Sequence, residues 1–244
     1  MKILYNIIRW LLLAACAGVI LAMVLMVWTA RDPGSVSGLL WTKEALELYE
    51  SDPEYFRVTA YKGFEDRNYS QDSRFGYSRT VRIDDLGQWQ VLIRYNDAVL
   101  RDLEESRGKT DFTEGERFVY TLEDEFGHIY TDYSYVWEKT SRHTFVRLAF
   151  DSVEESFSYE ETDESGNVKM KVDRIGELKL SVYCREDVKD GEYPERPEAV
   201  MYIWGDGTGV YEYEKVKKDL PKDMEPTDGL CHSSSLTDKE NEVE

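Results

Sequence analysis

The chain has 244 residues, with 30 basic and 49 acidic side chains and a formal net charge of −19. This acidity argues against nucleic acid and anionic lipid as partners, because both repel a negative surface. The length leaves room beyond the N-terminal segment for one good hydrophobic core or two small ones, and composition alone excludes neither an enzyme nor a binding protein.

The N-terminal segment is apolar without interruption from Trp10 to Trp28 and contains no charge and no proline. As a helix it spans roughly 28 Å, which matches the hydrocarbon core of a bilayer. Trp10 and Trp28 stand at its two ends, where indole rings favour the membrane interface. Lys2 and Arg9 precede it, so we expect a plasma-membrane, single-pass signal anchor with a cytoplasmic N-terminus and the bulk of the chain outside.

Two alternatives compete with an uncleaved anchor. A cleaved signal peptide has a shorter apolar region that ends at small residues, whereas Ala30 has Trp28 two positions before it. Leu13-Ala14-Ala15-Cys16 resembles a bacterial lipobox, but apolar residues continue well beyond Cys16. An anchor with a membrane-buried cysteine is therefore favoured.

Ala14, Gly18 and Ala22 recur every four residues and share one face of this helix. Small residues at that spacing let two membrane helices approach closely. They are a candidate packing face for a weak homodimer, with a monomeric anchor as the default.

The chain after the anchor begins with turn-rich residues and then a helical pattern. Arg31 to Gly38 is typical of a linker, and Thr42 is suited to cap a helix from Lys43 to about Glu50. Asn96 and Asp97 predict a second short helix, Ala98 to about Glu105.

Alternating apolar and polar residues, rich in aromatic and β-branched types, predict strands from Tyr55 onward. Turn signals separate them, including Gly127, Asp163–Asn167 and a Gly205–Gly209 turn between the last two strands. The predicted fold is mainly β: an antiparallel sandwich or open barrel with one or two short helices. The predicted organisation is a cytoplasmic stub (1–9), a transmembrane helix (10–29), a linker (30–41), an extracytoplasmic β-rich domain (42–217) and a disordered acidic tail (218–244).

Few residues carry recognisable chemistry. His128, His143 and His232 have no neighbours at metal-ligand or triad spacing, and no G-x-S-x-G elbow is present. Acidic pairs are too numerous to single one out for glycoside hydrolysis. The loops Asp163–Asn167 and Asp206–Gly209 lack the calcium pattern. We therefore assign no catalytic residue, metal or cofactor, and treat an enzyme as the less favoured reading.

Cysteines and aromatic residues give two weaker hypotheses. A disulfide between Cys184 and Cys231 would attach the tail to the sheet. Tyr133, Tyr135 and Trp137 share one face of a strand and, if exposed, would form a platform for a sugar or a peptide. The alternative is that this face points into the core. Asn68-Tyr-Ser70 fits the pattern for N-glycosylation in a secretory pathway.

The leading interpretation is a membrane-tethered extracytoplasmic binding module whose partner is a protein or a carbohydrate. The alternatives are an extracytoplasmic hydrolase with a carboxylate pair and an accessory subunit of a larger membrane complex.

Overall fold

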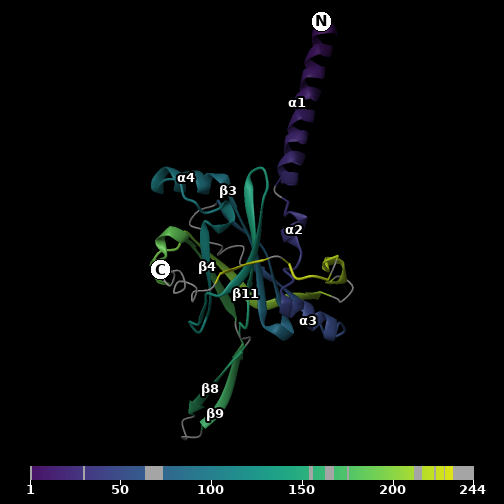
Figure 1. Cartoon of the computed structure of the whole chain (residues 1–244). Coiled ribbons are helices and arrows are strands. Elements are labelled where there is room, and N and C mark those ends of the chain that lie inside the picture. Colours follow the sequence, from purple (N-terminus) through teal and green to yellow (C-terminus); the bar gives the residue numbers. More distant parts are fainter. Residues whose placement is uncertain are drawn as a thin grey trace.

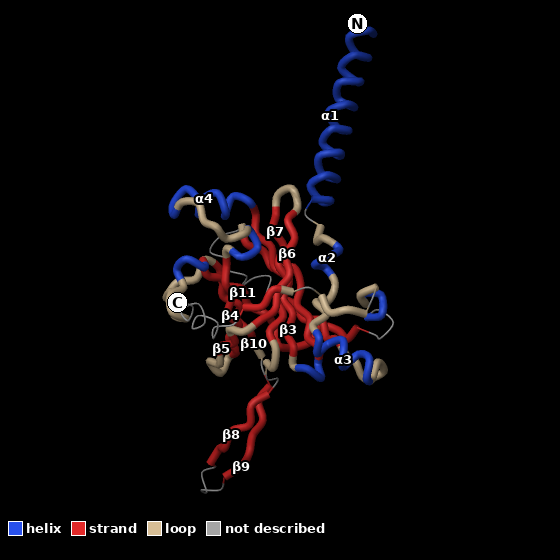
Figure 2. The backbone as a smooth tube through the Cα atoms, viewed as in Figure 1, coloured by secondary structure: helices blue, strands red, loops and turns tan. Residues whose placement is uncertain are grey.

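The computed structural model describes residues 2–29, 31–63, 74–153, 156–162, 168–174, 176–211, 216–222, 224–227 and 229–232. Helix α1 (Lys2–Thr29) extends away from a β-rich body (Figure 1). A hairpin of β8 (Ser156–Thr162) and β9 (Val168–Arg174) projects from the other side of that body (Figure 2). The body thus separates an apolar helix at one end from a two-stranded arm at the other.

The short helices begin where the sequence signals place them. Helix α3 (Lys43–Ser51) is capped by Thr42, whose hydroxyl accepts from the Ala45 N–H at 3.3 Å. Helix α4 (Asp97–Arg107) is capped by Asn96, whose side chain accepts from the Ala98 N–H at 2.9 Å. The remaining helical segments are α2 (Gly34–Ser37) and the 3-10 turns Asp84–Leu86, Glu114–Glu116, Arg185–Asp187 and Lys217–Asp219.

Within the described residues, ten strands form one antiparallel sheet in the order β12-β6-β7-β3-β2-β1-β11-β10-β4-β5. The prediction of a mainly β, antiparallel fold is confirmed. The strands are β1 (Val58–Gly63), β2 (Phe75–Ile83), β3 (Gln88–Asn96), β4 (Phe118–Asp124), β5 (Ile129–Tyr130), β6 (Tyr133–Lys139), β7 (His143–Phe150), β10 (Glu177–Cys184), β11 (Ala199–Tyr211) and β12 (Leu230–His232).

Strand β11 corrects the turn predicted at 205–209. Its first half pairs with β10 and its second half with β1, with register shifts opposite Tyr61. The glycines therefore lie in an irregular strand that passes from one partner to the next. Such shifts are typical of β-bulges, which glycine accommodates readily.

The sheet curves so that distant strands share one core. Apolar side chains of β4, β10 and β11 pack in the same cluster as those of β3, β6 and β7. The Tyr133 hydroxyl of β6 accepts from the Tyr120 N–H of β4 at 3.2 Å, although these strands are well separated in the sheet order. Among the described residues, the large sheet thus curves around its main hydrophobic cluster.

Two segments predicted to be irregular contribute to this body. Residues 31–41 were expected to be a linker, yet Val36, Leu40 and Trp41 are buried. Strand β12 falls inside the predicted disordered tail and pairs with Tyr133–Tyr135 of β6. Both corrections have the same cause: the partners of these residues are strands far away in sequence. The residues after 232 lie outside the described part of the chain.

Candidate functional site

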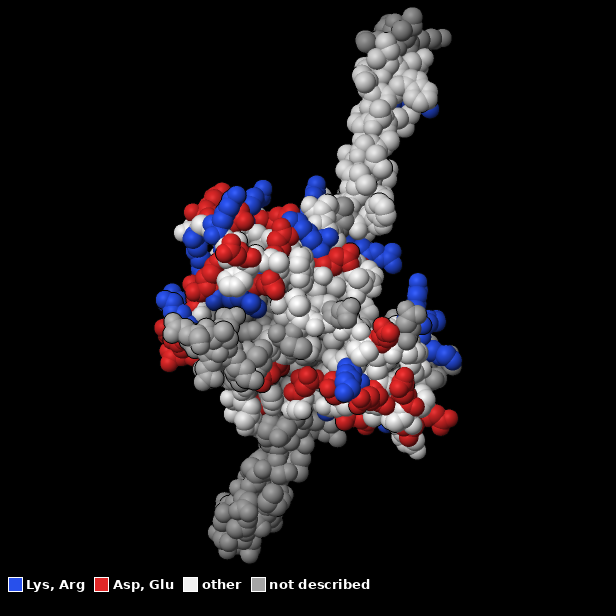
Figure 3. All heavy atoms as spheres, viewed as in Figure 1, with Lys and Arg blue, Asp and Glu red and all other residues white. Residues whose placement is uncertain are grey.

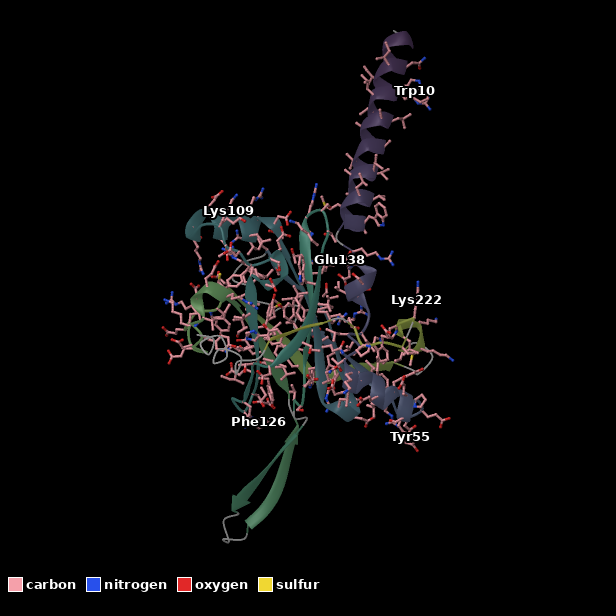
Figure 4. All side chains as sticks on the ribbon, in the orientation of Figure 1. Trp10, Tyr55, Lys109, Phe126, Glu138 and Lys222 are labelled. Carbon is pink, nitrogen blue, oxygen red and sulfur yellow. The ribbon has the colours of Figure 1, made fainter. Side chains whose placement is uncertain are left out.

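Helix α1 is long and apolar enough to cross a membrane over Asn6–Trp28, a property that it shares with signal sequences. The side chains that the structure describes along this helix are exposed, and Trp10 and Trp28 are 71% and 72% exposed. Figure 4 shows Trp10 far along the helix from the body. Ala14, Gly18 and Ala22 also face outward, and a side chain added at Gly18 would meet no atom within 4 Å. Their role as a packing face stays a prediction.

The segment between α1 and α3 is held on the outer face of the sheet by buried polar side chains. The Gln90 side chain accepts from the Leu40 N–H at 2.8 Å and donates to the Leu40 carbonyl at 2.7 Å. Gln88 donates to the Thr42 hydroxyl at 3.1 Å and to Asp151 at 2.6 Å. Because both glutamines are fully buried, water cannot readily replace these hydrogen bonds, and their loss would cost free energy of folding.

Two arginines hold the carbonyl end of α2 in the same way. Arg147 is 1% exposed, and its guanidinium donates to the carbonyls of Val36 at 3.1 Å and Ser37 at 2.9 Å. Arg79 of β2 also donates to the Ser37 carbonyl. We call residues 31–42 the anchor seat. These hydrogen bonds attach the segment after α1 to β2, β3 and β7.

The β8–β9 hairpin is the second feature with a functional shape. It forms a sheet of its own, with seven register pairs from Ser156–Arg174 to Thr162–Val168. Among the described strands, none of the ten in the large sheet pairs with it. The predicted turn at 163–167 lies outside the described residues.

A cavity of about 450 Å³ lies over β10 and β11, beneath the loop that precedes β11. Its lining combines Lys179, Ser181 and Tyr183 of β10 with Glu195 and Arg196 of the loop. Lys179 donates to Glu123 at 2.7 Å, and this hydrogen bond raises the lysine pKa. Among the described residues that line this cavity, Glu195 is the one carboxylate.

The predicted aromatic platform is wrong for two of its three residues. Tyr133 and Tyr135 are only 3% and 4% exposed and pack in the core cluster, so this face of β6 points inward. Burial raises the pKa of the Tyr133 hydroxyl well above its ordinary value. Trp137 is partly buried against the same cluster and covers Gly115. The inward alternative holds because the curved sheet encloses this face.

The histidines have structural partners. His128 Nδ1 lies 2.9 Å from Asp124, whose carboxylate also accepts from the Phe126 and His128 N–H groups in the β4–β5 turn. His143 starts β7, and burial lowers its pKa. His232 of β12 stacks on Tyr133 with ring centroids 5.0 Å apart.

The described part of the chain contains little that would support metal binding or thiol chemistry. No three His, Cys, Asp or Glu side chains are grouped there as metal ligands would be. Cys184 is a buried free thiol whose pKa is raised to about 11 by burial. It is therefore not bridged to Cys231 in this structure. The motif at 68–70 lies outside the described residues.

No protein-family model, curated protein or solved structure matches the chain.

Proposed function

We propose that this chain is a membrane-tethered extracytoplasmic binding module that engages a protein partner through the β8–β9 hairpin. In this proposal α1 spans the plasma membrane once. The basic residues Lys2 and Arg9 keep the N-terminus in the cytoplasm, and the body stands outside.

The observation that carries the proposal is the separation of the hairpin from the body. A two-stranded hairpin with no third strand is at best marginally stable in water. Strand edges that lack a neighbour are templates for a strand from another chain. A partner strand added beside β8 or β9 would supply the missing neighbour, which is a recurring mode of protein recognition.

The anchor seat supports the same proposal from the other end. Val36, Leu40 and Trp41 of the anchor seat are buried, so the segment that follows α1 is part of the body. The hairpin extends away from the end of α1 (Figure 1), so it is presented at a distance from the membrane surface. An accessory subunit of a larger membrane complex would use the same arm.

The test places a photo-crosslinking amino acid at Tyr159 in β8 of the full-length chain in native membranes. The matched control places it at Glu47 of α3, whose side chain is 66% exposed. We expect a discrete crosslinked product from position 159 and none from position 47. A second variant replaces residues 157–173 with a short Gly-Ser turn, which is tolerated because Ser156 and Arg174 are register partners.

The replacement variant should keep the thermal unfolding midpoint of the body and lose its partner on native gels. Equal crosslinking at both positions, or an unchanged complex without the hairpin, would contradict the proposal.

A further inference from the structure

A cavity of about 540 Å³ opens where α1 meets the body, and we call it the juxtamembrane cavity. Its volume lies within the range of small-molecule sites. Its lining includes Trp28, Arg31, Asp32, Gly34, Ser37 and Arg79. Figure 3 shows basic side chains on the surface beside the end of α1.

We propose that the juxtamembrane cavity holds the headgroup of a phospholipid that carries both a phosphate and a primary ammonium group, as phosphatidylethanolamine does. This inference rests on the membrane anchoring proposed above. It adds a lipid specificity that anchoring alone does not require.

The position of the cavity selects a lipid as its occupant. Trp28 lies in the last turn of α1, and indole rings settle at the level of the headgroups. Arg31 follows directly, its N–H donating to the Trp28 carbonyl at 3.3 Å. The anchor seat is packed on the sheet from Val36 onward, and the cavity lining includes Trp28 of α1 itself, so the cavity lies directly beside the end of that helix. Lipids that surround an embedded α1 therefore have their headgroups beside this opening.

The two arginines suit the phosphate. Arg31 is exposed, and its guanidinium makes no ion pair or hydrogen bond within the described part of the chain. Arg79 is half-buried and donates one hydrogen bond to the Ser37 carbonyl. A guanidinium has five N–H donors in a planar fork, so further donors remain for a phosphate oxygen.

Asp32 suits the ammonium group. One of its carboxylate oxygens accepts from the Ser78 hydroxyl at 3.0 Å, which fixes the side chain in the lining. A carboxylate beside two arginines favours a headgroup with charges of both signs. The acidity of the whole chain points the same way, because it disfavours a densely anionic membrane.

The experiment uses the full-length chain in nanodiscs that contain phosphatidylcholine with equal minor shares of phosphatidylethanolamine and phosphatidylglycerol. Native mass spectrometry then identifies the lipid retained on the released protein. We expect one phosphatidylethanolamine per chain, in preference to the other two lipids. An excess of soluble phosphoethanolamine should not displace it.

Three variants test the residues. Arg31→Gln should lower retention about fivefold, the effect of one basic side chain at a membrane surface. Asp32→Asn keeps the acceptor for Ser78 and should abolish the preference over phosphatidylglycerol. Gly34→Leu enlarges a residue of the cavity lining at a position where a Cβ meets no atom within 4 Å, and it should lower retention without disturbing the body.

The matched control is Arg57→Gln, which makes the same charge change two residues from Tyr55. Figure 4 shows Tyr55 on the side of the body away from α1. Arg57 is exposed, and the variant should retain the lipid as the wild type does.

The possible outcomes distinguish failure of the lipid site from failure of the anchor. Wild-type retention by Arg31→Gln, preference for phosphatidylglycerol, or displacement by phosphoethanolamine would overturn the lipid site. Release of the wild-type chain from membranes by alkaline carbonate would instead overturn the anchor on which the site rests.

Discussion

Gln90 and Leu40 exchange two hydrogen bonds across fifty residues of sequence, at 2.8 and 2.7 Å. The side-chain amide of Gln90 thus forms the same pair of hydrogen bonds with Leu40 that the backbone of a neighbouring strand would form. It satisfies both backbone groups of a residue that is buried on the outer face of the sheet. This pairing makes the segment after α1 part of the body.

Replacing Gln90 with alanine should therefore destabilise the body strongly. Two buried backbone groups would lose their partners, at about 1–3 kcal/mol each. We expect the free energy of unfolding to fall by about 2–6 kcal/mol, measured by urea denaturation with tryptophan fluorescence. The control Glu47→Ala changes an exposed residue and should stay within about 0.5 kcal/mol of wild type. Equal midpoints for both variants would show that the Leu40 bonds carry no stability.

Replacing Arg147 with lysine should loosen the anchor seat while it keeps the buried charge. Lysine lacks the planar fork that reaches both the Val36 and Ser37 carbonyls. We expect amide hydrogen exchange within residues 36–42 to accelerate at least about tenfold, which corresponds to a loss of about 1.4 kcal/mol. The amides of α4, which lies apart from α2 in Figure 1, serve as the internal control. Unchanged exchange at the seat would contradict this role for Arg147.

Replacing Gly115 with alanine should disrupt the packing of Trp137. A Cβ at this glycine would overlap the atoms of the indole ring nearest its attachment point, so the ring itself has to move. Overpacking of this kind costs about 1–3 kcal/mol. The expected result is a lower thermal midpoint with a change in tryptophan emission. Gly34→Ala, where the Cβ meets open space, is the matched control and should leave both unchanged or slightly improved.

Docking of β12 should weaken in acid because of His232. Burial lowers the pKa of this histidine below its ordinary value of 6.5, so the docked strand favours the neutral ring. Its contribution is complete above pH 6.5 and is lost as the pH falls from there through the lower pKa of the docked state. We expect faster proteolysis of the C-terminal segment in mildly acidic buffer. His232→Phe should keep the stack on Tyr133 and lose this pH dependence, whereas an identical pH profile would exclude His232 as its source.

Local signals in the sequence predicted α3 and α4 correctly, because Thr42 and Asn96 lie next to the helices that they cap. The anchor seat was not predictable in this way. Gln90 and Arg147 occupy positions on alternating strands that normally face water, and their partners Leu40 and Val36 are 50 and 111 residues away. The sequence of such a strand does not show which distant residue its polar side chain will contact, because the fold alone brings the two together.

Strand β6, which carries the aromatic residues, shows a second limit of prediction from sequence. Alternation indicates that Tyr133 and Tyr135 share a face of β6, but it does not say which face is covered. That depends on the curvature that brings Tyr120 of β4 opposite Tyr133. Arg31 follows α1 in the chain, whereas Arg79 belongs to β2. They come together at the juxtamembrane cavity only through the docking of α2 on β2 and β7.

The central claim is that one N-terminal helix holds this β-domain on the outer face of the membrane. The most direct measurement adds a protease to intact cells and follows both ends of the chain, with an alkaline carbonate wash of the remaining membranes. We predict loss of the body and retention of a short N-terminal fragment in the washed membranes. Protection of the body until the cells are lysed, or release of the fragment by the wash, would contradict the account.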